Sequence, residues 1–170
     1  MAASKVALIT AGSRGVGAAV ARALARDAYM RVVVNYHSDS TSANAIVKEL
    51  NELSPLAASS QANFVALKAD MNNREEIVRL VNDTVRTMGR LDVVVSNVGW
   101  TRMTDFMNLQ DADVETDWDQ CFRINVKSHF FLFQACRKHL EDSEGAFIAT
   151  ASVAGVKPSG SSLVRADKTR

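Results

Sequence analysis

The sequence has few cysteines, almost no net charge and no long hydrophobic run. Its two cysteines, Cys121 and Cys136, belong to no CxxC or Cys/His cluster, which argues against a disulfide framework and a zinc site. The 20 Lys and Arg residues nearly balance the 19 Asp and Glu residues, so no basic surface favours a nucleic acid partner. Apolar runs such as 93–95 are far shorter than the roughly 18 residues that a membrane span needs. We expect a soluble, cytoplasmic protein with no metal, nucleic acid or membrane partner.

The composition is otherwise that of a folded domain. Of the 170 residues, 47% are hydrophobic and 23% are charged, which excludes a disordered or low-complexity chain. No repeat or linker divides the sequence, so we expect one domain over residues 1–170. Residues 159–170 depart from this pattern as a short charged tail.

Strand-like and helix-like segments alternate along the chain. Short β-branched or apolar runs predict five strands, at residues 6–9, 31–36, 64–69, 91–96 and 146–151. Composition and spacing predict helices over about 15–28, from a cap at Thr41 or Ser42 to residue 53, between Asn72/Asn73 and Gly89, and over about 117–140. This alternation predicts an α/β fold, a Rossmann-like doubly wound parallel sheet of about five strands.

A glycine-rich turn follows the first predicted strand. Residues 10–17 read Thr-Ala-Gly-Ser-Arg-Gly-Val-Gly, at the end of the sheet where open α/β folds bind their ligands. Such glycines let the backbone approach a pyrophosphate, and a helix beginning near Gly15 offers N–H groups to an anion. No Gly-Lys-Ser/Thr follows, which excludes a Walker loop, and Val20 breaks the GxGxxG spacing. A turn that only tightens packing is the alternative.

Five motifs, taken in order, resemble those of the classical short-chain dehydrogenase/reductase family. The turn is similar to the family's Thr-Gly-x-x-x-Gly-x-Gly, with Ala11 at its first glycine. Residues 70–71 match an acidic position that the family uses at the adenine, residues 96–99 resemble its Asn-Asn-Ala-Gly, and residues 124–127 and 151–155 resemble its asparagine and serine segments. The resemblance implies a cofactor site formed by Thr10, Gly12, Ser13, Arg14, Gly15, Val16, Gly17, Asn35, Tyr36, Ser38, Asp70, Met71, Asn97, Gly99 and Lys168.

The residues after the second predicted strand indicate which nucleotide binds. An acidic residue about 20 positions past the glycines would hold the ribose 2′-OH of NAD and repel a 2′-phosphate. Here residues 35–38 read Asn-Tyr-His-Ser, and the first carboxylate is Asp39. Arg14 stands where NADP-preferring members carry a basic residue, and a guanidinium can bind a phosphate bidentately. We expect NADP(H) rather than NAD, with neutral hydrogen bonds from Asn35, Tyr36 and Ser38; a solvated surface arginine is the alternative for Arg14.

The resemblance implies four catalytic groups, of which one is missing. The family uses a tyrosine acid, a lysine that lowers the pKa of that tyrosine and holds the ribose, a serine donor and an asparagine that positions a water. Ser152, Lys168 and Asn125 fall on three of these places. The tyrosine's place, four residues before the lysine, is Val164, and no tyrosine follows Tyr36. A general acid contributes about 10²- to 10⁴-fold, so we expect very weak or no turnover even if the cofactor binds.

The resemblance covers only the cofactor half of the family fold. Family members are longer, and we expect the last strands, helices and substrate lid of that fold to be lacking; a natural truncation and a gene-model accident are both open. Residues 130–133 are four consecutive apolar residues on the predicted 117–140 helix, and such a run surrounds a helix. We therefore expect an exposed apolar patch that makes the chain a homo-oligomer or drives its self-association through this helix.

Three functions stay open at this stage. The first is an NADP(H)-dependent oxidoreductase that acts on a small carbonyl or alcohol substrate, and the motifs from Thr10 to Gly155 support it. The second is a nucleotide-binding remnant without catalysis, such as a pseudoenzyme, and Val164 supports it. The third is a bare interaction module, resting on the aromatic helix face. A methyltransferase is less expected, because the acid that it would need after the second strand is absent.

Overall fold

The structure is a computed structural model that describes residues 4–56, 62–105, 107–111 and 113–155. Strands and helices alternate in the predicted order, and each of the five predicted strands forms, three of them one or two residues shorter than predicted. The elements up to the fourth strand are β1 (Val6–Ile9), α1 (Gly15–Arg26), β2 (Arg31–Tyr36), α2 (Ser40–Leu53), β3 (Phe64–Lys68), α3 (Arg74–Met88) and β4 (Val93–Ser96). A helical region and β5 (Ala146–Ala149) follow.

The five strands form one parallel sheet in the order β3-β2-β1-β4-β5. Leu8 of β1 pairs with Val33 of β2 on one side and with Val94 of β4 on the other. The chain therefore builds outward from β1 to β3, then returns through α3 to start the other half at β4. The strand order reverses between β1 and β4, and in open α/β sheets this is where a ligand crevice forms.

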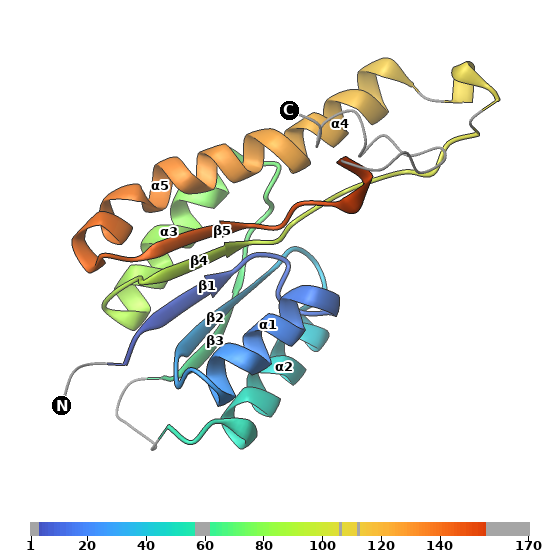
Figure 1. Cartoon of the computed structure of the whole chain (residues 1–170). Helices are drawn as coiled ribbons and strands as arrows, with labels where there is room; N and C mark the ends of the chain where they lie inside the picture. The colour runs from blue at the N-terminus through green and yellow to red at the C-terminus, as the bar shows by residue number, and fades with distance from the viewer. Residues whose placement is uncertain (1–3, 57–61, 106, 112, 156–170) are drawn as a thin grey trace.

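Helices cover both faces of the sheet, which is the Rossmann-like arrangement that the sequence predicts. Figure 1 shows α1 and α2 on one face and α3 with α5 (Ser128–Ser143) on the other. Leu8 and Val94 pack with Ile77 and Leu132 in the apolar layer under α3 and α5, whereas Ile9 and other side chains pack under α1 and α2. All four residues of β1 are buried, which explains its uninterrupted apolar sequence.

The ends of α2 and α3 are set by capping side chains. Oδ1 of Asn73 accepts the backbone N–H groups of Glu75 and Glu76, and Gly89 ends α3 with a φ of 79°, as predicted. The prediction that Thr41 or Ser42 caps α2 is wrong. The cap is Asp39, whose carboxylate accepts the N–H of Ser42 at 2.9 Å and its hydroxyl at 2.6 Å. The helix begins at Ser40 because the carboxylate of Asp39 satisfies an amide of its first turn.

The helix predicted over 117–140 is longer than predicted and is not a uniform α-helix. It runs through η2 (Val114–Trp118), α4 (Asp119–Phe122), η3 (Arg123–Lys127) and α5, and Figure 1 shows α4 and α5 in one continuous path. Both η2 and η3 are π turns. Such turns are rare in proteins, and those that do occur are often at functional sites. One of the two π turns contains Asn125.

The outer surface of α5 and the edge strand β5 carry exposed apolar side chains. Phe130 is 56% exposed and Phe133 is 42% exposed, whereas Leu132 between them is fully buried. Ile148 of β5, which lies at the edge of the sheet, is also exposed. The predicted exposed patch is therefore present on the described surface. No helix within the described ranges is long and apolar enough to span a membrane.

Candidate functional site

A cleft of about 490 Å³ lies over the carboxyl ends of β1, β2, β3 and β4. Its walls come from the four segments that follow these strands, together with Gln120 and Ile124 of the helical region. Nine of the residues predicted to bind a cofactor line it: Ser13, Arg14, Asn35, Tyr36, Ser38, Asp70, Met71, Asn97 and Gly99. The structure thus brings together residues that lie up to 86 positions apart, because parallel strands place their carboxyl ends at one edge.

The three positions of the turn after β1 that hold glycine require it for different structural reasons. A Cβ on Gly17 would lie 2.4 Å from the carbonyl oxygen of Ala11, and one on Gly12 would lie 3.1 Å from the carbonyl oxygen of Ile9. Tight packing therefore explains Gly12 and Gly17. It does not explain Gly15, where a Cβ would meet nothing within 4 Å, although the φ of +53° favours glycine.

The first turn of α1 borders this cleft without a capping side chain. Arg14 is the N-cap residue but makes no side-chain cap hydrogen bond, and the first turn contains no acidic residue. Gly15 and Val16 are both exposed. Amide groups at such a helix end carry a partial positive charge and bind anions, so this turn fits a pyrophosphate.

Thr10 and Asn97 join the ends of β1, β4 and β5. The Thr10 hydroxyl oxygen accepts the N–H of Asn97 at 2.8 Å and of Val98 at 3.1 Å. The Asn97 side-chain amide donates to the carbonyl of Thr10, and its oxygen accepts the hydroxyl of Thr150. Thr10 is fully buried, so it shapes the site rather than facing the cleft.

The structure corrects the expected use of Asn35. Its side chain is buried, and its oxygen accepts the N–H of Ala11 at 3.3 Å. Its Nδ2 donates to the carbonyl oxygens of Tyr36, Leu67 and Ala69. The three carbonyl groups take up both N–H groups of the amide. Asn35 therefore holds the ends of β1, β2 and β3 together instead of offering a hydrogen bond to a phosphate.

The charges beside the end of β2 favour an anion. Arg14, Tyr36 and Ser38 line the cleft there, together with His37, which the motif comparison did not single out. Asp39 also lines it, but its carboxylate is hydrogen-bonded at the start of α2. The Ser42 hydroxyl and N–H, with a smaller contribution from the charge of Arg14, hold the pKa of Asp39 below its usual value.

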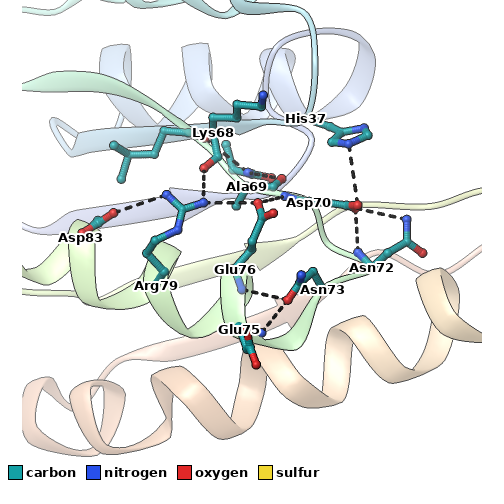
Figure 2. Close-up of polar contacts among 12 residues, drawn as sticks. His37, Lys68, Ala69, Asp70, Asn72, Asn73, Glu75, Glu76, Arg79 and Asp83 are labelled. Carbon is teal, nitrogen blue, oxygen red and sulfur yellow. Dashed lines mark hydrogen bonds and ion pairs between the residues drawn. The ribbon is translucent and has the colours of Figure 1, made fainter.

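The loop after β3 places Asp70 in the cleft (Figure 2). Oδ1 of Asp70 accepts both the N–H and the side-chain amide of Asn72, while Oδ2 lies 3.7 Å from Nε2 of His37. Its neighbour Met71 is nearly buried and packs into the apolar layer under α3. Both residues line the cleft, where Asp70 supplies a carboxylate and Met71 supplies apolar surface.

A second, smaller cavity of about 200 Å³ adjoins the cleft and contains two of the predicted catalytic residues. Asn125 and Ser152 both line it, and it shares residues 97–100 with the larger cleft. The Ser152 hydroxyl oxygen accepts the N–H of Ala154 at 3.2 Å, which leaves its own proton to donate. The structure thus places a hydroxyl donor next to the larger cleft.

Asn125 holds the wall between the two cavities. Its Oδ1 accepts the N–H of Trp100 at 2.9 Å, and its Nδ2 donates to the Trp100 carbonyl at 2.8 Å and to the sulfur of Cys121 at 3.2 Å. These contacts fix the side chain of Asn125 against the backbone of Trp100, and the role of Asn125 in positioning a water stays a prediction. Trp100, which lines both cavities, was missed; only its place directly after Gly99 could have drawn attention to it.

The two remaining catalytic predictions concern Val164 and Lys168, and both lie outside the described residues.

A model of the short chain dehydrogenase family matches residues 5–164. The chain belongs to this family. It is 36% identical over 152 residues to a hydroxynaphthalene reductase-like protein of Metarhizium brunneum. This alignment covers 89% of this chain and 52% of that protein. It is 32% identical over 153 residues to versicolorin reductase 1 of Aspergillus parasiticus, covering 90% of this chain and 54% of that protein.

A solved structure of the family has the same fold. The short chain dehydrogenase of Burkholderia cenocepacia in complex with NADP superposes with a TM-score of 0.83 at 28% identity, over 97% of this chain and 63% of that chain. The chain thus spans about half the length of these two curated relatives.

Proposed function

We propose that residues 1–170 form one cofactor-binding domain that binds NADP(H) in the 490 Å³ cleft. The observation that carries this proposal is that Arg14 lines the cleft beside the end of β2. Tyr36 and Ser38 follow there, and no carboxylate precedes the capping residue Asp39. The first turn of α1 would hold the pyrophosphate, Asp70 the adenine, and Lys168 the ribose near the nicotinamide. The relative of known structure that binds NADP supports the choice of nucleotide.

An Arg14→Gln variant tests this proposal. Loss of a charged hydrogen-bond partner lowers the NADPH affinity about tenfold or more, whereas the NADH affinity stays the same because NADH has no 2′-phosphate. Isothermal titration of both nucleotides measures the two affinities. Arg22→Gln is the matched control, since Arg22 lies on the same helix but pairs with Glu49 at 2.7 Å. Equal losses for NADPH and NADH would contradict the assignment of Arg14.

We further propose that the site is built for hydride transfer between a ketone and a secondary alcohol. NADPH supplies the hydride when it is bound. Ser152 donates a hydrogen bond to the substrate oxygen from the smaller cavity, and Asn125 keeps the wall at Trp100 in place. The two curated relatives are named as reductases, which favours reduction of a small carbonyl compound.

The position that the family resemblance assigns to the general acid of this reaction is Val164. Val164 has no proton to give, so we expect turnover below that of a tyrosine-containing site by about 10²- to 10⁴-fold. Val164→Tyr is expected to raise ketone-dependent NADPH oxidation by about 10²-fold or more, and Val164→Phe, which adds the ring without the hydroxyl, is expected to raise nothing. Brisk turnover by the unaltered chain would contradict this account of Val164.

A nucleotide-binding protein without catalysis is the second candidate, and Val164 favours it. It is distinguished from a weak enzyme by NADPH binding that leads to no turnover with any ketone, even in Val164→Tyr. Both candidates share the cleft and differ only in the completeness of the catalytic groups. In either case, we propose that the chain associates with itself through residues 117–140, where Phe130 and Phe133 are exposed.

A further inference from the structure

Asp70, in the loop after β3, presents one carboxylate oxygen to the cleft, while its other carboxylate oxygen is hydrogen-bonded within the loop (Figure 2). Oδ1 of Asp70 accepts two hydrogen bonds from Asn72, at 2.8 and 3.1 Å. Oδ2 faces His37, whose Nε2 lies 3.7 Å away, beyond ordinary hydrogen-bond distance. Oδ2 is therefore the oxygen that can accept a hydrogen bond from a ligand, provided that the Asp70 side chain keeps this orientation.

Glu76 holds this loop from the side of α3. Its Oε2 accepts the backbone N–H of Asp70 at 2.8 Å, as Figure 2 shows. Glu76 itself is fixed in the first turn of α3, where its N–H donates to the capping oxygen of Asn73. Because the amide and the carboxylate belong to one residue, fixing the amide of Asp70 also fixes the direction in which its side chain leaves the backbone.

Arg79 keeps the carboxylate of Glu76 in place. Its guanidinium donates to Oε2 of Glu76 and to the carbonyl oxygen of Lys68, both at 3.2 Å, and lies 3.9 Å from a carboxylate oxygen of Asp83. The side chains of Glu76 and Arg79 are 35% and 52% exposed. Ion pairs this exposed contribute little to folding stability, so the value of this network lies in the geometry that it imposes on the loop.

We propose that Glu76 is a positioning residue of the cleft, which aims Oδ2 of Asp70 at the exocyclic amino group of an adenine. This inference rests on the proposed binding of NADP(H). An amino group donates to a carboxylate oxygen, whereas the carbonyl that replaces it in hypoxanthine has no proton to donate and is repelled. A correctly aimed Asp70 therefore discriminates between the two bases, and a loop without Glu76 does not.

The test compares NADP⁺ with its deaminated analogue, nicotinamide hypoxanthine dinucleotide phosphate, by isothermal titration of the full chain. The unaltered chain is expected to bind NADP⁺ about tenfold more tightly than the analogue, and Glu76→Ala to reduce this ratio to about twofold or less. Glu76→Gln keeps an oxygen that accepts the Asp70 N–H, so it retains the ratio. Glu75→Ala, in the same helical turn with its carboxylate directed away from Asp70 in Figure 2, also retains it.

The outcomes separate this inference from the function on which it rests. If Glu76→Ala keeps the tenfold ratio, the inference is overturned while NADP(H) binding stands. An equal loss of affinity for both nucleotides also overturns it, because a purely structural role for Glu76 weakens both alike. If the unaltered chain binds NADP⁺ and the hypoxanthine analogue equally well, Asp70 does not select adenine, and the positioning role of Glu76 is overturned as well. If the unaltered chain binds neither nucleotide, the proposed function fails and the inference with it.

Discussion

At the scale of single residues, the turn after β1 combines two requirements that the sequence pattern alone does not separate. Gly12 and Gly17 allow the turn to pack against neighbouring backbone, whereas Gly15 allows a left-handed conformation at an open surface. Ala11 adopts a φ of 48°, which an alanine adopts at some cost in energy. The turn is therefore held by packing at Gly12 and Gly17 and is open at Gly15.

This division predicts different costs for two alanine substitutions. Gly17→Ala places a Cβ 2.4 Å from the Ala11 oxygen and 2.8 Å from Nδ2 of Asn97, so backbone must move. We expect it to reduce the free energy of unfolding by about 3 kcal/mol, the upper range for overpacking. Gly15→Ala has open space and is the matched control, with a strain cost of about 1 kcal/mol. Chemical denaturation measures the free energy of unfolding of both variants. Equal losses would contradict the distinction between a packed Gly17 and an open Gly15.

The sequence predicted nine of the residues that line the cleft, but it could not predict what each amide does there. From the sequence we expect Asn35 to donate a hydrogen bond to a phosphate and Asn125 to position a water. The structure shows that the Asn35 amide is engaged by carbonyl groups up to 34 residues away, and that the Asn125 amide is engaged by the backbone of Trp100, 25 residues away. Such contacts depend on how strands pair and helices pack, so no local pattern contains them.

At the scale of elements, the capping residues in the sequence predicted both ends of α3 correctly but predicted the wrong N-cap residue for α2. Asn73 and Gly89 are unambiguous signals for the two ends of a helix. Before α2, four successive residues, Asp39 to Ser42, can all cap a helix, and only the structure shows which one does. The π turns between residues 114 and 127 were not predicted, because their hydrogen-bond pattern leaves no signature in apolar spacing.

The cap of α2 predicts a pH-dependent stability. The pKa of Asp39 is lowered in the folded chain, chiefly by the Ser42 hydroxyl, so its stabilisation is present at neutral pH and is lost as the pH falls through that lowered pKa. Asp39→Ala is expected to lower the melting temperature at pH 7 and to converge with the unaltered chain under acid conditions. Asp39→Asn keeps a capping oxygen without a titrating group, so its deficit relative to the unaltered chain is smaller. Thermal unfolding followed by circular dichroism between pH 7 and 2.5 measures this, and a pH-independent difference for Asp39→Ala would contradict it.

At the scale of the whole molecule, the described fold contains a cleft at the carboxyl ends of its strands and an exposed apolar surface on α5 and β5. The sequence predicted this surface because four consecutive apolar residues cannot all face one side of a helix. It could not predict that Phe131 and Leu132 would be the covered ones, since that depends on how α3 and β4 pack against α5. The exposed members of this run are Phe130 and Phe133.

We expect the unaltered chain to self-associate and a Phe130→Glu/Phe133→Glu double variant to be monomeric, because burying two charges in an apolar contact is unfavourable. Sedimentation velocity distinguishes the two states. Leu53→Glu is the matched control, since Leu53 is a partly exposed apolar residue of α2, on the other face of the sheet. An unaltered chain that sediments as a monodisperse monomer would disprove the proposed role of the patch.

Calorimetric titration of the unaltered chain with NADPH, NADH and S-adenosylmethionine tests most directly whether the cleft selects NADP(H), as we propose. We predict saturable NADPH binding at least about tenfold tighter than NADH binding, because only NADPH offers a 2′-phosphate to Arg14, and no binding of S-adenosylmethionine. NADH binding as tight as that of NADPH, or no binding of either nucleotide, would contradict the account.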